Sequence, residues 1–117
     1  MKDVILCVGE ALIDLIQKDE AFYPKVGGAP CNVAAALGKL EQKARFFTKL
    51  GDDTFARSIL KTLNECHVDT SFIKCDQNYD TSLAFVSLDE DGQRHFDFYR
   101  KSAADLSVSE NDFDEAI

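Results

Sequence analysis

Two adjacent glycines, Gly27 and Gly28, stand directly before a segment of small residues with helical spacing. Pro30 follows two positions later, where its fixed backbone angle φ suits the first turn of a helix. The start of a helix offers N–H donors without partners inside the helix, together with the positive end of the helix dipole. This stretch therefore predicts a site for an oxygen-rich or anionic ligand. Asn32 could add its amide to that site, or it could only cap the helix.

Three other side chains could complete such a site. Asp14 interrupts an apolar segment, residues 12–18, and Phe98 and Arg100 lie near the end of another extended segment, residues 94–100. A carboxylate inside an apolar strand is costly unless it faces water, a partner or a ligand. A carboxylate, an amide and backbone N–H groups together suit a neutral polyol, whose apolar face an aromatic ring could cover.

Each of these side chains also has a purely structural interpretation. Asp14 could face solvent on an edge strand and discourage edge-to-edge pairing. Arg100 could form a surface ion pair with Asp97 or Asp105. Phe98 could belong to the core. The residues alone leave these alternatives open.

The elements around these residues alternate between strand and helix. Strands are expected at residues 4–8, 12–18, 21–26, 44–50 and 68–74, and helices at residues 30–40 and 56–66. The first segment is continuously apolar, which predicts a central strand covered on both faces. Strand and helix in this order indicate right-handed crossovers and a parallel sheet, hence an α/β fold.

The last third of the chain has a different character. Residues 83–88 and 94–100, joined by a turn at residues 89–92, predict a β-hairpin, which must pair with the strands of residues 12–26 or with another subunit. Alternation along its second strand places Phe98 and Arg100 on one face. Ser109, followed by acidic residues, predicts the start of a helix. The chain ends within that helix, so we expect it to be a fragment.

Composition narrows the function. The 117 residues carry 13 basic and 21 acidic side chains, a formal net charge of −8, which argues against nucleic acid as a partner. The first apolar run is too short for a signal peptide or a membrane span, so we expect a cytoplasmic protein with no membrane partner. Cys66, His67 and Cys75 lack the spacing of a zinc site, which favours small buried thiols in a reducing compartment.

Several spaced motifs together resemble one family, the ribokinase-like (PfkB) carbohydrate kinases, and within it the fructokinases. The motifs are residues 8–14 (VGEALID), 27–34 (GGAPCNVA), 51–53 (GDD), 96–100 (FDFYR) and 103–105 (AAD). The resemblance implies a parallel Rossmann-like sheet flanked by helices plus a small β-sheet lid, of which this is the N-terminal portion. The core would comprise residues 1–11, 29–75 and 102–117, and the lid residues 12–27 and 80–101.

The resemblance also implies an activity, the transfer of the γ-phosphoryl group of ATP to a sugar hydroxyl with Mg²⁺. Asp14, Gly28 and Asn32 resemble the family's sugar ligands, Gly27 belongs to the joint beneath the lid, and Phe98 and Arg100 correspond more loosely to lid positions that reach the substrate. The lid would also join two subunits into a homodimer. The family's catalytic Gly-Ala-Gly-Asp motif and nucleotide pocket do not occur here, so the 117 residues alone should be inactive.

Three other functions fit some of these features. The sugar could be ribose or 2-keto-3-deoxygluconate rather than fructose. The chain could be a non-catalytic sugar-binding or dimerisation module. A Rossmann-type nucleotide binder is a weaker match, because no GxGxxG turn follows the first strand. The sequence departs from the family signature at Glu41, where a small residue is usual, which predicts a differently closed helix end.

Overall fold

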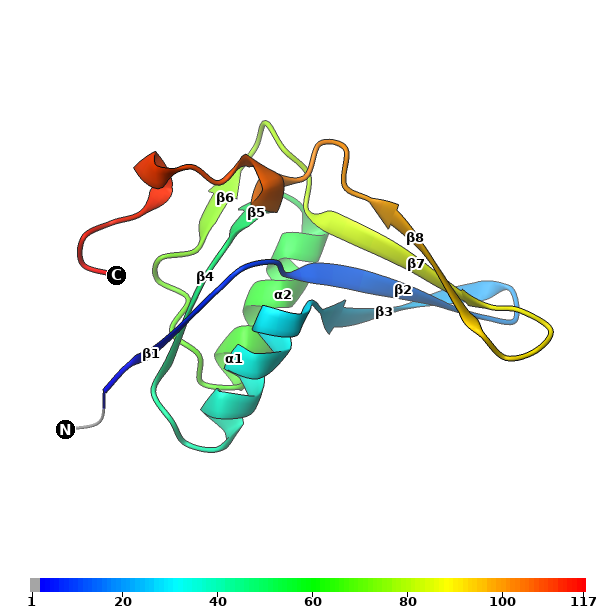
Figure 1. Ribbon diagram of the computed structural model, residues 1–117, viewed down its shortest axis with the longest axis horizontal. Helices are drawn as coiled ribbons and strands as arrows, with labels where there is room; N and C mark the ends of the chain where they lie inside the picture. The colour runs from blue at the N-terminus through cyan, green and yellow to red at the C-terminus, as the bar shows by residue number, and fades with distance from the viewer. Residues whose placement is uncertain (1–2) are drawn as a thin grey trace.

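The computed structural model describes residues 3–117 and consists of an α/β core from which a β-sheet lid projects (Figure 1). The core contains β1 (Ile5–Val8), β4 (Ala44–Phe47), β5 (Lys49–Gly51), β6 (Lys74–Asp76), α1 (Ala29–Lys39) and α2 (Thr54–Glu65). The lid contains β2 (Leu12–Lys18), β3 (Ala21–Gly27), β7 (Ser82–Leu88) and β8 (Arg94–Tyr99). Two short 3₁₀ turns, η1 (Ala104–Ser107) and η2 (Glu110–Asp112), follow the lid. The α/β class with a small lid is therefore confirmed.

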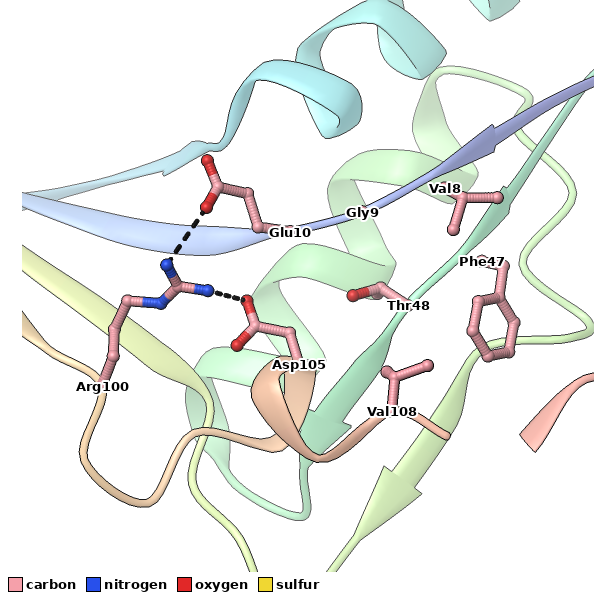
Figure 2. Close-up of a pocket in the computed structure, with 8 residues that line it drawn as sticks. All are labelled: Val8, Gly9, Glu10, Phe47, Thr48, Arg100, Asp105 and Val108. Carbon is pink, nitrogen blue, oxygen red and sulfur yellow. Dashed lines mark hydrogen bonds and ion pairs between the residues drawn. The ribbon is translucent and has the colours of Figure 1, made fainter. Parts of the chain in front are cut away.

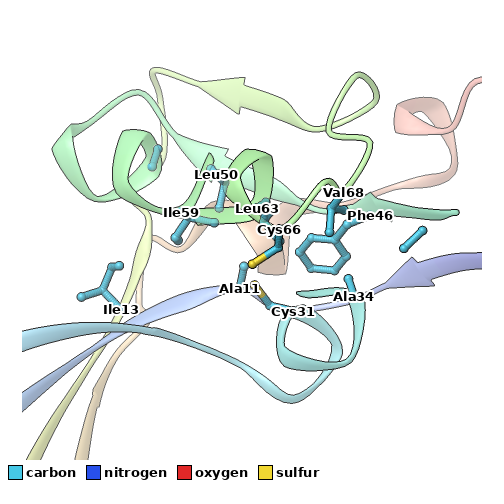
Figure 3. Packing of buried hydrophobic residues seen from close by; sticks show 12 residues of the cluster. Ala11, Ile13, Cys31, Ala34, Phe46, Leu50, Ile59, Leu63, Cys66 and Val68 are labelled. Carbon is cyan, nitrogen blue, oxygen red and sulfur yellow. The ribbon is translucent and has the colours of Figure 1, made fainter. Parts of the chain in front are cut away.

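The core strands run parallel, as the strand and helix order predicts. β1 pairs with β4 in the register Ile5↔Ala44, and β5 pairs with β6 in the register Lys49↔Lys74. A small hydrophobic cluster fills the space between these strands and the two helices (Figure 3). Phe46 and Leu50 from the strands and Ile59 and Leu63 from α2 are fully buried there. Strands with a helical layer across one face are the arrangement that crossover connections require.

The two helices approach each other closely because their facing residues are small. A Cβ atom added to Gly38 of α1 would collide with the carbonyl oxygen of Cys66 at the end of α2. Cys31 and Cys66 are both buried, and burial raises the pKa of the Cys31 thiol to about 11. Such thiols behave as small apolar side chains. Cys75 is exposed, and the described residues contain no group of three or more side chains that could hold a metal ion.

Both phenylalanines of β4 are buried, on opposite faces of the strand. Phe46 points into the cluster with the helices, and Phe47 packs against Phe113 with the ring centroids 4.5 Å apart. This arrangement confirms the prediction of a strand covered on both sides. The predicted strand of residues 44–50 is, however, interrupted at Thr48, so that it forms β4 and β5.

The first strand differs from expectation. Within residues 3–117, β1 pairs only with β4, and Ile5, Leu6 and Val8 each leave 40–47% of their surface exposed. The predicted cover on both faces of this strand is therefore absent from the described part of the chain. The apolar residues of β1 therefore lie along an edge and a face of the strand that no described segment covers.

The predicted strand of residues 68–74 is wrong for most of its length. A single bridge joins Asp69 to Arg45, and regular pairing begins only at Lys74. The Asp69 carboxylate accepts hydrogen bonds from the backbone N–H and the hydroxyl of Ser71, at 2.9 and 2.6 Å. A local side-chain turn of this kind competes with strand pairing. The predicted C-terminal helix is likewise reduced to the 3₁₀ turn η2, although Ser109 forms a capping box with Asp112 at its start.

The end of α1 also corrects a prediction. Glu41 adopts a left-handed conformation, with φ of 63°, and the chain closes the helix with bonds from Glu41 N–H to Gly38 O and from Gln42 N–H to Leu37 O. This is the Schellman arrangement usually built on glycine. The helix end is therefore closed in the usual way, with a non-glycine residue in the left-handed position. His67 does the same after α2, with φ of 64°.

The lid is one four-stranded sheet in the order β3-β2-β7-β8. β2 pairs antiparallel with β3 and parallel with β7, and β7 pairs antiparallel with β8. The hairpin therefore joins the earlier lid strands of the same chain, one of the two outcomes that the sequence allows. Figure 1 shows the sheet extending away from the helices, with both termini on the opposite side of the molecule. No helix among residues 3–117 is long and apolar enough to cross a membrane.

Candidate functional site

The pairing register of the lid brings four of the six predicted site residues to one face. Asp14 on β2 and Phe98 on β8 both lie opposite Ala84 of the central strand β7, so they belong to one row across the sheet. They are two strand spacings, about 10 Å, apart. Gly27 lies opposite Leu12, one row closer to the core. Arg100 follows Phe98 by two residues, so it belongs to that inner row.

Asp14 sits in a half-buried position on this face. It lies opposite Lys25 of β3 and lines a pocket of about 140 Å³ together with Lys25, Arg94 and Phe96. Burial raises the pKa of the Asp14 carboxyl, and the positive charges of Lys25 and Arg94 offset part of that rise. The described structure gives the Asp14 side chain no hydrogen-bond donor of its own, so its oxygens are free to accept from a ligand.

The two glycines bring the end of β3 against Asp14 and the β1–β2 corner. A Cβ atom added to Gly27 would lie 2.6 Å from Oδ2 of Asp14. Gly28 has a φ of 99°, and a Cβ atom there would lie 2.7 Å from the carbonyl oxygen of Glu10. A larger residue at Gly28 would push the two backbone segments apart, and one at Gly27 would displace the Asp14 carboxylate. The glycine pair thus holds the start of α1 close to the Asp14 carboxylate.

Asn32 lies on the exposed surface of the first turns of α1. The N-cap of this helix is Gly28, without a side-chain hydrogen bond in the described chain, and the backbone N–H of Asn32 donates to the Gly28 carbonyl at 2.9 Å. The interpretation that Asn32 caps the helix is therefore wrong. Its amide remains available to a ligand at this end of the helix.

Phe98 is an exposed aromatic ring rather than a core residue. It leaves 60% of its surface exposed and stacks on Phe96, with the ring centroids 6.0 Å apart and the ring planes 10° apart. A pair of parallel exposed rings on the same face as Asp14 offers an apolar wall to a ligand held there.

Arg100 stands slightly apart from this row, over a second pocket of about 140 Å³ (Figure 2). Its guanidinium bonds to three groups: Nε donates to the Ser82 hydroxyl at 3.2 Å, Nη2 to Asp105 at 3.0 Å, and Nη1 pairs with Glu10 at 3.3 Å. The predicted pairing with Asp105 is confirmed, but the Asp105 side chain is only 4% exposed, so this is not a surface pair.

Sequence reasoning did not assign a site role to Glu10, Ser82, Asp105 or Thr48. The Thr48 hydroxyl lines the pocket beneath Arg100, is buried, and has no hydrogen-bond partner in the described structure. Glu10 and Asp105 lie inside the motifs that the sequence singled out, so their positions carried a signal. The pairing of Asp105 with Arg100 could be predicted, but the approach of Glu10 to the same guanidinium could not, because Glu10 and Asp105 lie 95 residues apart in the chain.

Comparison with known proteins identifies the family. Residues 2–117 match the pfkB family of carbohydrate kinases, almost the whole chain. The chain belongs to the pfkB carbohydrate kinase family. The predicted membership of this family is therefore confirmed.

Fructokinases are prominent among this pfkB chain's relatives. It is 38% identical to a probable fructokinase-7 of Arabidopsis thaliana, across 97% of this chain and 36% of that protein. The crystal structure of a fructokinase from Xylella fastidiosa superimposes with a TM-score of 0.91 and 41% identity, covering 99% of this chain and 38% of that one. A second Xylella fastidiosa fructokinase structure, with bound ATP, has a TM-score of 0.89 and 40% identity, covering 99% of this chain and 39% of that one. The chain thus spans little more than a third of the relatives it matches.

Proposed function

We propose that this chain is the sugar-binding and lid part of an ATP-dependent sugar kinase, with fructose as the sugar. The observation that carries the proposal is the row of Asp14 and Phe98 on one lid face, with the glycine pair beside Asp14, in a chain that matches the pfkB family over residues 2–117. The fructokinase relatives support fructose as the first substrate to test.

In this proposal each residue has a definite role. Asp14 accepts hydrogen bonds from sugar hydroxyls, and burial keeps these bonds strong. Asn32 donates and accepts through its amide, and the Gly27–Gly28 backbone lets the sugar approach the start of α1. Phe98 covers the apolar face of the sugar, and Arg100 bounds the site at the inner row.

ATP and Mg²⁺ would be held by the part of the kinase outside this chain. The described residues contain no group of carboxylates or histidines that fits a metal ion, and no Gly-Ala-Gly-Asp sequence occurs. A related fructokinase of Xylella fastidiosa binds ATP, which supports ATP as the phosphoryl donor. When bound, the nucleotide supplies the phosphoryl group, and the residues of this chain position the sugar that receives it.

We also propose that two copies of the kinase associate through their lids, in the cytoplasm. All six residues of β8 are exposed, and the lid face with Asp14 carries the exposed rings of Tyr23, Phe96 and Phe98. Exposed aromatic residues on a sheet are typical of surfaces that another chain covers. Sedimentation analysis of the full-length protein tests the dimer, and a monomer at micromolar concentration contradicts it.

The proposed reaction is tested with the full-length protein, ATP, Mg²⁺ and a panel of fructose, ribose and 2-keto-3-deoxygluconate. We expect the highest kcat/KM for fructose. A higher value for one of the other two would keep the kinase and change its substrate. Calorimetric binding of a sugar without any phosphorylation would favour the non-catalytic module instead.

A further inference from the structure

The pocket beneath Arg100 has an unusual balance of charge. Of the described residues that line it, Arg100 is the only cation, and Glu10 and Asp105 are both carboxylates. Figure 2 shows the guanidinium between these two acids, with a dashed contact to each. One positive charge against two negative charges leaves the immediate surroundings net negative. An arginine in this setting does not attract an anion.

Three of the five N–H donors of Arg100 already have partners. Each of its three nitrogens has a partner within 3.3 Å, namely the Ser82 hydroxyl, the Asp105 carboxylate and the Glu10 carboxylate. A substrate carboxylate at this guanidinium would lie beside the carboxylates of Asp105 and Glu10, which repel it. Arginine alone is a preferred partner of carboxylates, so the occupation of its donors decides what it can bind.

Asp105 is the member of this network that is held most firmly. Its side chain is 4% exposed, against 37% for Glu10. Its Oδ1 accepts a hydrogen bond from the Ser82 hydroxyl at 2.9 Å, while its Oδ2 accepts from Arg100 at 3.0 Å. Ser82 in turn accepts from Arg100, so the three side chains close a ring of hydrogen bonds. Such a ring keeps the guanidinium in one orientation.

The remaining free polar group of the pocket is neutral. The Thr48 hydroxyl is buried there without a partner among the described residues, and a hydroxyl can both donate and accept. The pocket therefore offers carboxylate oxygens and a hydroxyl, which suit the hydroxyl groups of an uncharged sugar. A sugar acid would bring a third negative charge to the same place.

We propose that Asp105, supported by Ser82, is a specificity-determining residue that occupies and neutralises Arg100, so that the site accepts neutral sugars and excludes sugar acids. Glu10 adds to this effect from a more exposed position. The inference rests on the proposed sugar kinase function, and it names the substrate class of that same site. Asp105 acts through Arg100 and the charge of the pocket, so it is a positioning residue.

The test is Asp105→Asn in the full-length protein, because this change removes the charge and keeps the shape. The ratio of kcat/KM for fructose to that for 2-keto-3-deoxygluconate should fall at least about tenfold. The fall should come mainly from a lower KM for the acid. Calorimetry without ATP should show the same change in the relative dissociation constants of the two compounds.

Two further variants provide a second test and a control. Glu10→Gln should move the ratio in the same direction by a smaller factor, because Glu10 is more exposed than Asp105. Asp97→Asn is the matched control, since Asp97 is exposed and points to the opposite face of β8 from Phe98 and Arg100. This control should leave the ratio unchanged.

A folded Asp105→Asn protein with an unchanged ratio overturns the inference and leaves the kinase assignment intact. If that variant does not fold, an unchanged ratio in Glu10→Gln overturns it. A full-length protein that phosphorylates no sugar refutes the proposed function, and the calorimetric comparison of fructose with the acid then decides the inference by itself. Binding of neither compound would overturn both.

Discussion

The α/β core and the lid bury their apolar residues in opposite ways. Phe46, Leu50, Ile59 and Leu63 of the core have essentially no exposed surface, whereas all six residues of β8 in the lid are exposed. The chain's own helices cover the buried cluster of the core, whereas no described segment covers the exposed residues of β8. Large buried residues therefore maintain the fold, and the large exposed residues of β8 are free to serve binding.

The largest expected effect is on the free energy of unfolding, and it distinguishes a core residue from an exposed lid residue. Phe46→Ala should lower the free energy of unfolding by about 3–5 kcal/mol, because it leaves a cavity in the buried cluster. Phe98→Ala should lower it by less than about 1 kcal/mol, because the ring is already exposed. Denaturant unfolding of both full-length variants measures the difference. Equal losses would mean that Phe98 is a structural residue and would remove it from the site.

A lid substitution should affect binding more than stability. Asp14→Asn should raise the KM for the sugar about 10- to 100-fold, because a hydrogen bond to a charged group contributes about 1.5–3 kcal/mol. Steady-state kinetics and a thermal melt of the same protein check this prediction. Glu20→Gln, at the exposed turn between β2 and β3, is the control. An unchanged KM for Asp14→Asn would remove Asp14 as a ligand.

A third prediction concerns the contact that joins the two regions. Asp53 caps α2 by accepting from Ala56 N–H at 2.8 Å, and it also accepts from the N–H and hydroxyl of Thr81, just before β7. Burial raises the pKa of the Asp53 carboxyl, but these hydrogen bonds and the positive charge of Arg57 together lower it by more, so its pKa lies below the ordinary value. Asp53→Asn should cost about 1–2 kcal/mol of unfolding free energy at pH 7.

The pH dependence of this loss has a definite sign. A lowered pKa stabilises the fold above the ordinary carboxyl pKa of about 4, and that contribution disappears as the pH falls through the lower, folded-state pKa. Melting temperatures of wild type and Asp53→Asn should therefore converge below about pH 4. Asp52→Asn, in a surface pair with Arg57 at 4.0 Å, should change little at any pH. A gap that stays constant down to pH 2 would contradict the prediction.

The smallest expected effect lies at the end of α2. His67 adopts a left-handed φ of 64° where the helix closes, a conformation that costs a non-glycine residue about 1 kcal/mol. His67→Gly should therefore raise the free energy of unfolding by up to about 1 kcal/mol, while His67→Ala should not. Denaturant titration of the Gly and Ala variants measures both free energies of unfolding. Equal values for Gly and Ala would show that the left-handed conformation is not strained here.

Much of the fold could be predicted because its signals are local. The boundaries of α1 and α2 follow from apolar spacing, from Pro30 and from Asp53, and the structure places them within two residues of expectation. The failures share a cause. Residues 68–74 have strand-like composition, but Asp69 bonds to Ser71 and turns the chain. The exposure of β1 depends on which other segments of the chain pack against it. The composition of the strand does not contain that information.

The sequence by itself determined the family, the order of strands and helices, and which side chains share a face of the lid, because alternation along a strand is a local property. Tertiary structure decided that β2 pairs with β7, some 70 residues later, and so places Asp14 in the row of Phe98. It also decided that Glu10, Ser82 and Asp105 meet at Arg100. These contacts join segments that are distant in the chain, so they form only when the strands of the lid sheet have paired.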